Sequence, residues 1–257
     1  MFNNLIKLLD FPPVVFALSL VALWLSIQIG SLVSRKLRPV QGDERDDLGL
    51  VMSGCLTLLG LIIGFSFSMA VSRYDQRKNY EEEEANAIGT EYVRTDLLTT
   101  ADAARVRQLL TQYLDQRVLS YTIRDARQLE QIDRETAKLQ TEMWFVVQGA
   151  ATAHATPAVA LVVSGMNDVL NRQGYTQAAW WNRIPVAAWS LMAALAICCG
   201  LLIGYSAHRR ETLLFMVLPF VVAITFFLIA DIDSPHSGVI RVLPQNLISL
   251  SQSLHKQ

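Results

Sequence analysis

The hydrophobic residues of this chain are concentrated in four long apolar runs, and a charged stretch separates the second run from the third. The runs cover residues 11–33, 49–72, 183–205 and 212–230. A helix needs about 20 apolar residues to cross the hydrocarbon core of a bilayer. The pattern therefore predicts an all-α, polytopic membrane protein with four transmembrane helices and a soluble helical domain inserted between helices two and three.

The second apolar run continues into the charged stretch without a helix-breaking residue. No proline occurs between Leu50 and Thr90, and strong helix formers follow Arg73. One helix is therefore predicted to leave the bilayer and to continue into water as a rod. We interpret Glu81 to Glu84 on this rod as a solvent-exposed face, with a cation site as the alternative.

The charged stretch, residues 73–182, shows the periodicity of helices. Apolar residues recur on one helical face in each of three pieces: Ala103, Val106, Leu110, Tyr113 and Val118; Leu129, Ile132, Leu139, Met143 and Val146; Val159, Val162, Val163, Met166 and Leu170. No run alternates convincingly between apolar and polar residues, as a half-buried strand would. We expect a helical hairpin or small bundle in which the rod is one member.

These patterns divide the chain into four segments. Residues 1–72 hold transmembrane helices one and two, 73–182 the soluble helical domain, 183–230 helices three and four, and 231–257 a C-terminal segment. Four spans put both termini and the soluble domain on the same side of the membrane. The sequence does not decide whether that side is the cytoplasm, because two sets of positive charge nearly balance. One set lies in the short loops (Arg35, Lys36, Arg38, Arg45, Arg209 and Arg210), and the other follows helix two (Arg73, Arg77 and Lys78).

Two kinds of stripe run along the predicted transmembrane helices. Small residues at four-residue spacing, where another backbone can approach closely, indicate helix packing. They are Gly60, Gly64 and Ser68 in helix two, and Gly200 and Gly204 in helix three. A second, apolar stripe on helix two has three open interpretations, as a lipid-facing, core or pore-lining surface. It consists of Leu58, Ile62, Phe65 and Met69.

The fourth helix ends in two aspartates, Asp231 and Asp233. Negative charge at the C-terminus of a helix is electrostatically unfavourable, so these carboxylates call for partners. Three arginines are expected at the same membrane surface, and we interpret all five residues as a charge cluster; the arginines are Arg73, Arg77 and Arg183. Two alternatives are that both carboxylates are simply solvated, or that they help to bind a cation such as calcium.

Composition and motifs exclude several classes of function. Hydrophobic residues make up 52% of the chain, and its net charge of −1 offers no basic face for nucleic acid. The motifs of hydrolases, P-loop proteins, zinc proteases and dinucleotide-binding enzymes are absent, and no Cys/His spacing of a metal site occurs. We therefore expect no enzyme activity, no cofactor and no metal site. No charged residue interrupts the apolar runs, which argues against a proton-coupled transporter.

Several motifs resemble those of a bacterial membrane family labelled bestrophin-like. They are the run 57–77 with 84–90, the tripeptide 183–185, and the segments 231–235 and 237–238. The resemblance implies a more distant likeness to bestrophins, which are pentameric anion channels with four transmembrane helices and a pore lined by helix two. It also implies that Ile62, Phe65 and Met69 form a hydrophobic constriction. The acidic calcium clasp of animal bestrophins is not matched beyond Asp231 and Asp233.

The leading hypothesis is a homo-oligomeric ion channel of the bacterial plasma membrane, with helix two lining the pore. Its partners would be other copies of itself, in a pentamer if the resemblance holds, together with the lipid bilayer and small inorganic ions. Anion conduction is what the resemblance implies. The alternative is a non-conducting membrane scaffold or sensor whose helical domain binds a protein partner.

Overall fold

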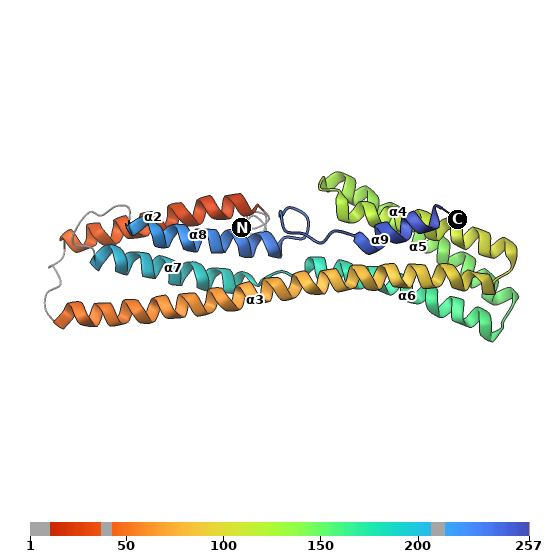
Figure 1. Ribbon diagram of the computed structural model, residues 1–257, viewed down its shortest axis with the longest axis horizontal. Helices are drawn as coiled ribbons and strands as arrows, with labels where there is room; N and C mark the ends of the chain where they lie inside the picture. Colours follow the sequence, from red (N-terminus) through yellow and green to blue (C-terminus); the bar gives the residue numbers. More distant parts are fainter. Residues whose placement is uncertain (1–10, 37–42, 207–213, 257) are drawn as a thin grey trace. The chain divides into compact units, whose positions relative to one another are not determined.

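The described residues of the computed structural model are 11–36, 43–206 and 214–256, and their regular structure is entirely helical (Figure 1). The chain divides into two compact units. We call Met1–Ser72 with Arg183–Arg241 the membrane unit, and Arg73–Asn182 with Val242–Gln257 the helical unit. One helix, α3 (Asp43–Arg94), contributes its first part to the membrane unit and its second part to the helical unit.

The membrane unit contains α2 (Pro12–Lys36), the first part of α3, α7 (Val186–Ser206) and α8 (Leu214–Asp233). All four helices are long and apolar enough to cross a membrane. The predicted all-α class with four membrane-spanning helices is thereby confirmed. The predicted start of the fourth helix at 212, and the loop residues Arg38, Arg209 and Arg210, lie outside the described residues.

Close backbone contacts join α2 to α7. A Cβ atom added to Gly204 would lie 2.0 Å from the carbonyl oxygen of Ile27, and one added to Gly200 would lie 2.0 Å from the hydroxyl of Ser26. Glycine thus lets the two helices approach more closely than any larger residue allows. α8 packs on the same pair through edge-to-face aromatic contacts, which are Phe16 with Phe220, Phe16 with Phe227, and Trp189 with Phe226.

The helical unit is a bundle built around a single apolar core. It contains the second part of α3, a short 3-10 helix η1 (Thr95–Leu97), α4 (Thr100–Thr122), α5 (Ala126–Ala153), α6 (Pro157–Trp181) and α9 (Gln245–Leu254). Side chains of Thr99, Asp125 and Thr156 cap the N-termini of α4, α5 and α6. The three predicted apolar faces supply much of the core, including Val106, Leu110, Tyr113, Leu139, Met143, Val162 and Met166.

The C-terminal helix α9 was not expected from the sequence. It is short and uncharged, and its apolar residues Leu247, Leu250 and Leu254 pack against the core of the helical unit. Its N-cap residue, Pro244, makes no side-chain hydrogen bond to the helix. A carboxylate from α3 supplies this cap instead, as described below.

Candidate functional site

The apolar part of α3 is the least covered of the candidate membrane spans. Within its most apolar 18-residue window, only 6% is buried inside the chain. On the proposed pore stripe, Leu58 is 52% exposed and Phe65 is 62% exposed, while Ile62 and Met69 are half-buried. Such a surface is stable only when lipid tails or another protein cover it.

The small residues of α3 lie in open space, in contrast to those of α7. A Cβ atom added to Gly60 or Gly64 would meet no atom of the described residues within 4 Å beyond its own helix, and Ser68 is exposed. Gly200 and Gly204, at the same spacing, lie directly against α2. Packing inside one chain therefore accounts for the stripe on α7, whereas the stripe on α3 is left available to another molecule.

The two aspartates at the end of α8 are buried and bind backbone groups. Asp231 accepts hydrogen bonds from the backbone N–H groups of Val239 at 2.8 Å and Ile240 at 2.7 Å. Asp233 accepts a shared hydrogen bond from the N–H of Ile184, at 3.2 and 3.1 Å from its two oxygens. The side chains of both residues are in a buried environment, with residue exposures of only 2% and 4%, so the interpretation that they are solvated is wrong.

This geometry fits a structural role for the aspartates better than a cation site. Asp231 folds the chain back after α8, and Asp233 fixes the entry to α7. N–H donors already occupy oxygens that a cation would need. Across the part of the chain that the structure describes, no group of three or more His, Cys, Asp or Glu side chains could hold a metal ion. The proposed pairing with Arg73, Arg77 and Arg183 stays a prediction.

A buried ion pair ties three helices of the helical unit together. The guanidinium of Arg117 on α4 donates to both oxygens of Glu84 on α3, and the Thr176 hydroxyl on α6 donates to the same carboxylate at 3.1 Å. The Arg117 and Glu84 side chains are both fully buried. Burial is the largest single effect and lowers the pKa of Arg117, but Glu84, Tyr113 and Tyr121 together outweigh it, so the pKa is raised overall. Arg117 therefore stays charged and paired with Glu84. Its guanidinium also lies over the ring of Trp180.

The glutamates at 81–84 therefore do not form the solvated face that the sequence suggested. Glu81 and Glu84 are 1% and 0% exposed, Glu83 is half-buried and pairs with Arg172, and only Glu82 is exposed. The buried pair lies on the face of α3 that continues through Ile88. The local sequence carried no signal for this burial, because the donors, at Asn246 and Arg117, lie far along the chain.

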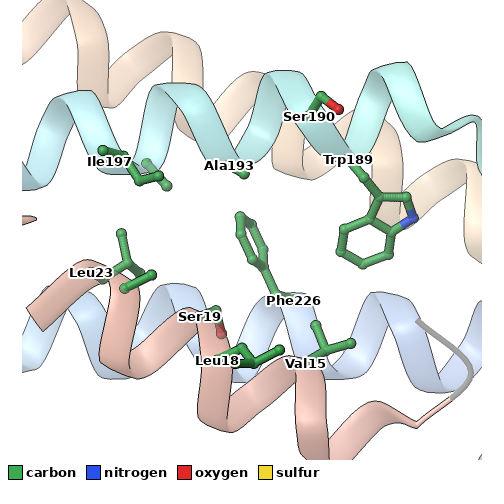
Figure 2. Close-up of a pocket in the computed structure, with 11 residues that line it drawn as sticks. Val15, Leu18, Ser19, Leu23, Trp189, Ser190, Ala193, Ile197 and Phe226 are labelled. Carbon is green, nitrogen blue, oxygen red and sulfur yellow. The ribbon is translucent and has the colours of Figure 1, made fainter. Parts of the chain in front are cut away.

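An apolar cavity of about 300 Å³ lies among α2, α7 and α8 in the membrane unit (Figure 2). The ring of Phe226 points from α8 toward Ala193 of α7, and Val15, Leu18 and Leu23 of α2 line the other side. One of its two hydroxyl groups, that of Ser19, is already bonded to the carbonyl of Phe16. The other lining side chains carry no hydroxyl group, and most are aliphatic or aromatic, so the cavity offers few groups that could bind an ion or a polar ligand.

Comparison with known proteins agrees with this architecture. The family model of the bestrophin-like domain matches residues 14–247. Crystal structures of two variants of a bacterial bestrophin homologue from Klebsiella pneumoniae have similar folds. One aligns with a TM-score of 0.64 and 14% identity over 94% of this chain and 98% of that chain. The other gives 0.63 and 12% over 94% of each chain. A search of curated protein sequences gave no match.

Proposed function

Because the chain belongs to the bestrophin-like family, we propose that it assembles with copies of itself into an ion channel whose pore is lined by α3. The proposed location is the bacterial plasma membrane, with both termini and the helical unit on the same side. Bestrophins conduct anions as pentamers, and the resemblance supports the same ion class and subunit number here.

One observation carries the proposal: the apolar part of α3 is uncovered in the single chain. α7 has the same kind of small-residue stripe, yet it buries that stripe against α2. If α3 merely faced lipid, it would have no need of Gly60 and Gly64, since bulky apolar residues cover lipid-facing helices equally well. Packing of α3 against its counterpart in other copies would use both the small residues and the apolar stripe.

The length of α3 suits a channel that continues beyond the membrane. Its 52 residues would extend about 78 Å at the α-helical rise, against a hydrocarbon core of about 30 Å. The pore-lining helix is therefore also a wall of the helical unit. In a ring of copies, we propose that the helical units form a vestibule.

The proposed constriction is formed by Ile62, Phe65 and Met69, which lie on the same pore-lining stripe as Leu58. These side chains are apolar, so a narrow ring of them would gate by losing water rather than by binding an ion. Replacing a large side chain by alanine should widen the ring and make it easier to hydrate.

Ion flux into liposomes tests this proposal with a matched pair of variants. Phe65→Ala removes a ring from the proposed pore face, and Phe67→Ala removes the same ring from another face of α3, where it is 40% exposed. We expect chloride flux several-fold above wild type for Phe65→Ala and unchanged flux for Phe67→Ala. Background flux in wild type and in both variants would refute conduction, and equal increases in both would refute the assignment of the pore face.

The alternative of a non-conducting scaffold or sensor has one observation in its favour. Two adjacent aromatic residues of α5, Trp144 and Phe145, are 37% and 74% exposed in the helical unit. Exposed aromatic residues are typical of protein-binding surfaces. Under this alternative, replacing both by serine would abolish binding of a protein partner, and Phe65→Ala would leave flux at background.

A further inference from the structure

Glu91, in the second part of α3, is a buried carboxyl group without a hydrogen bond. Its side chain has no exposed surface, and neither oxygen has a hydrogen-bond partner among the described residues. The other two buried glutamates of this helix are fully engaged, since Glu81 and Glu84 each accept three hydrogen bonds. An isolated buried carboxylate is so unfavourable that such a group tends to bind a proton instead.

The carboxyl group lies directly against the backbone of α6. A Cβ atom added to Gly165 would be 1.9 Å from Oε2 of Glu91 and 2.4 Å from Nη1 of Arg94. A larger residue there would displace the ends of the Glu91 and Arg94 side chains, whereas glycine lets both side chains lie against α6. Nη1 of Arg94 is 3.9 Å from Oε2, which is too long for a hydrogen bond. The contact between the two helices is thus built around an acid that no donor satisfies.

The surrounding charges do not hold Glu91 in its ionised form. Arg94, on the same helix, is partly exposed and favours ionisation, whereas Asp168 on α6 opposes it. The nearest charge of η1, Asp96, is paired with Arg107 of α4. Burial is the largest effect and raises the pKa of Glu91 from 4.5 to about 8.

We propose that Glu91 is a proton-binding site that couples the packing of α3 on α6 to pH. With the proton bound, the neutral carboxyl group rests against Gly165. When the proton leaves, a bare carboxylate faces Gly165 and Asp168, and the contact weakens unless Arg94 moves in or α6 moves away. This inference goes beyond the proposed channel and does not depend on conduction, because it concerns only the helical unit.

The free energy of unfolding should depend on pH because Glu91 binds a proton in the folded state. The unfolded chain loses the Glu91 proton near pH 4.5, whereas the folded chain keeps it until about pH 8. Between these values the folded state binds more protons than the unfolded state, so this residue lowers the stability as the pH rises. Above about pH 8 its contribution is constant.

The test uses the full-length protein in detergent and compares Glu91→Gln with Glu82→Gln, an exposed glutamate on the same helix. Thermal unfolding is measured from about pH 5 to about pH 9. Glutamine cannot titrate, so we expect the Tm of Glu91→Gln relative to wild type to rise with pH up to about pH 8 and to level off above it. Glu82→Gln should follow wild type. Parallel curves for Glu91→Gln and wild type would overturn the proposal.

A second variant keeps the test decisive if Glu91→Gln does not fold. Asp168 is exposed and raises the pKa of Glu91, so Asp168→Asn should fold and release the proton more easily. Amide hydrogen exchange of residues 157–181, corrected for the intrinsic effect of pH, should increase with a midpoint near pH 8 in wild type. In Asp168→Asn the midpoint should shift to lower pH. Exchange that does not depend on pH, or an unshifted midpoint, would refute proton binding by Glu91.

Discussion

Glu81 of α3 and Asn246 of α9 are joined by two hydrogen bonds, one from the backbone N–H at 2.9 Å and one from the side-chain amide at 2.7 Å. The same carboxylate accepts a third from the N–H of Leu247 at 3.0 Å. Glu81 thus supplies the N-terminal cap that α9 lacks in its own sequence, and its negative charge lies at the favourable end of the helix dipole.

Removal of this cap should release the C-terminal helix. Glu81→Ala leaves the N–H groups of Asn246 and Leu247 without their acceptor, at an expected cost of about 1–3 kcal/mol in the free energy of unfolding. Amide exchange within 245–254 should become faster, while α5 keeps its protection. Glu82→Ala is the control, because Glu82 is exposed. Unchanged exchange in α9 after Glu81→Ala would contradict the capping role.

The buried pair of Arg117 and Glu84 should respond strongly to the loss of one partner. Arg117→Met leaves Glu84 as an unpaired buried charge, which should lower the free energy of unfolding by about 3–5 kcal/mol. The double variant Arg117→Met/Glu84→Gln should recover part of that loss. Chemical denaturation measures both. Arg134→Met provides a surface control, because Arg134 and Glu130 form an exposed pair. A small effect of Arg117→Met alone would show that Glu84 finds another partner.

The glycines of α3 and α7 should differ in what they stabilise. Gly204→Ala places a methyl group 2.0 Å from the carbonyl oxygen of Ile27, so α2 and α7 must separate and the Tm should fall. A Cβ atom at Gly64 has no atom of the described residues within 4 Å beyond its own helix, so Gly64→Leu should leave the helix content unchanged. In the proposed assembly, however, it should shift the protein to smaller species in size-exclusion chromatography. Identical behaviour of the two variants would show that their environments are equivalent.

The sequence predicted the elements of the fold well, because apolar runs and helical periodicity are local properties. The resemblance to the bestrophin-like family is likewise confirmed. The continuous helix through Arg73 was predicted from the absence of proline and is present in α3. The three apolar faces in 100–170 follow from residue spacing alone. Each of these inferences needed only residues that are close together in the chain.

The buried charges could not be predicted in the same way. A glutamate is normally solvated, and the burial of Glu81 and Glu84 depends on donors far along the chain, at Asn246 and Arg117. The helix α9 was missed for the same reason, since its cap comes from another helix. Spacing also could not distinguish Gly64 from Gly204, because it indicates that a backbone can approach but not which one does.

The oligomeric state of the detergent-solubilised protein, measured by native mass spectrometry, tests the central claim most directly. The claim is that other copies of the chain cover the apolar face of α3 and create an axis for a pore. We predict a single closed assembly of several subunits, with five as the number implied by the resemblance to bestrophins. A stable monomer or dimer would contradict the claim, because neither can surround an axial pore with α3.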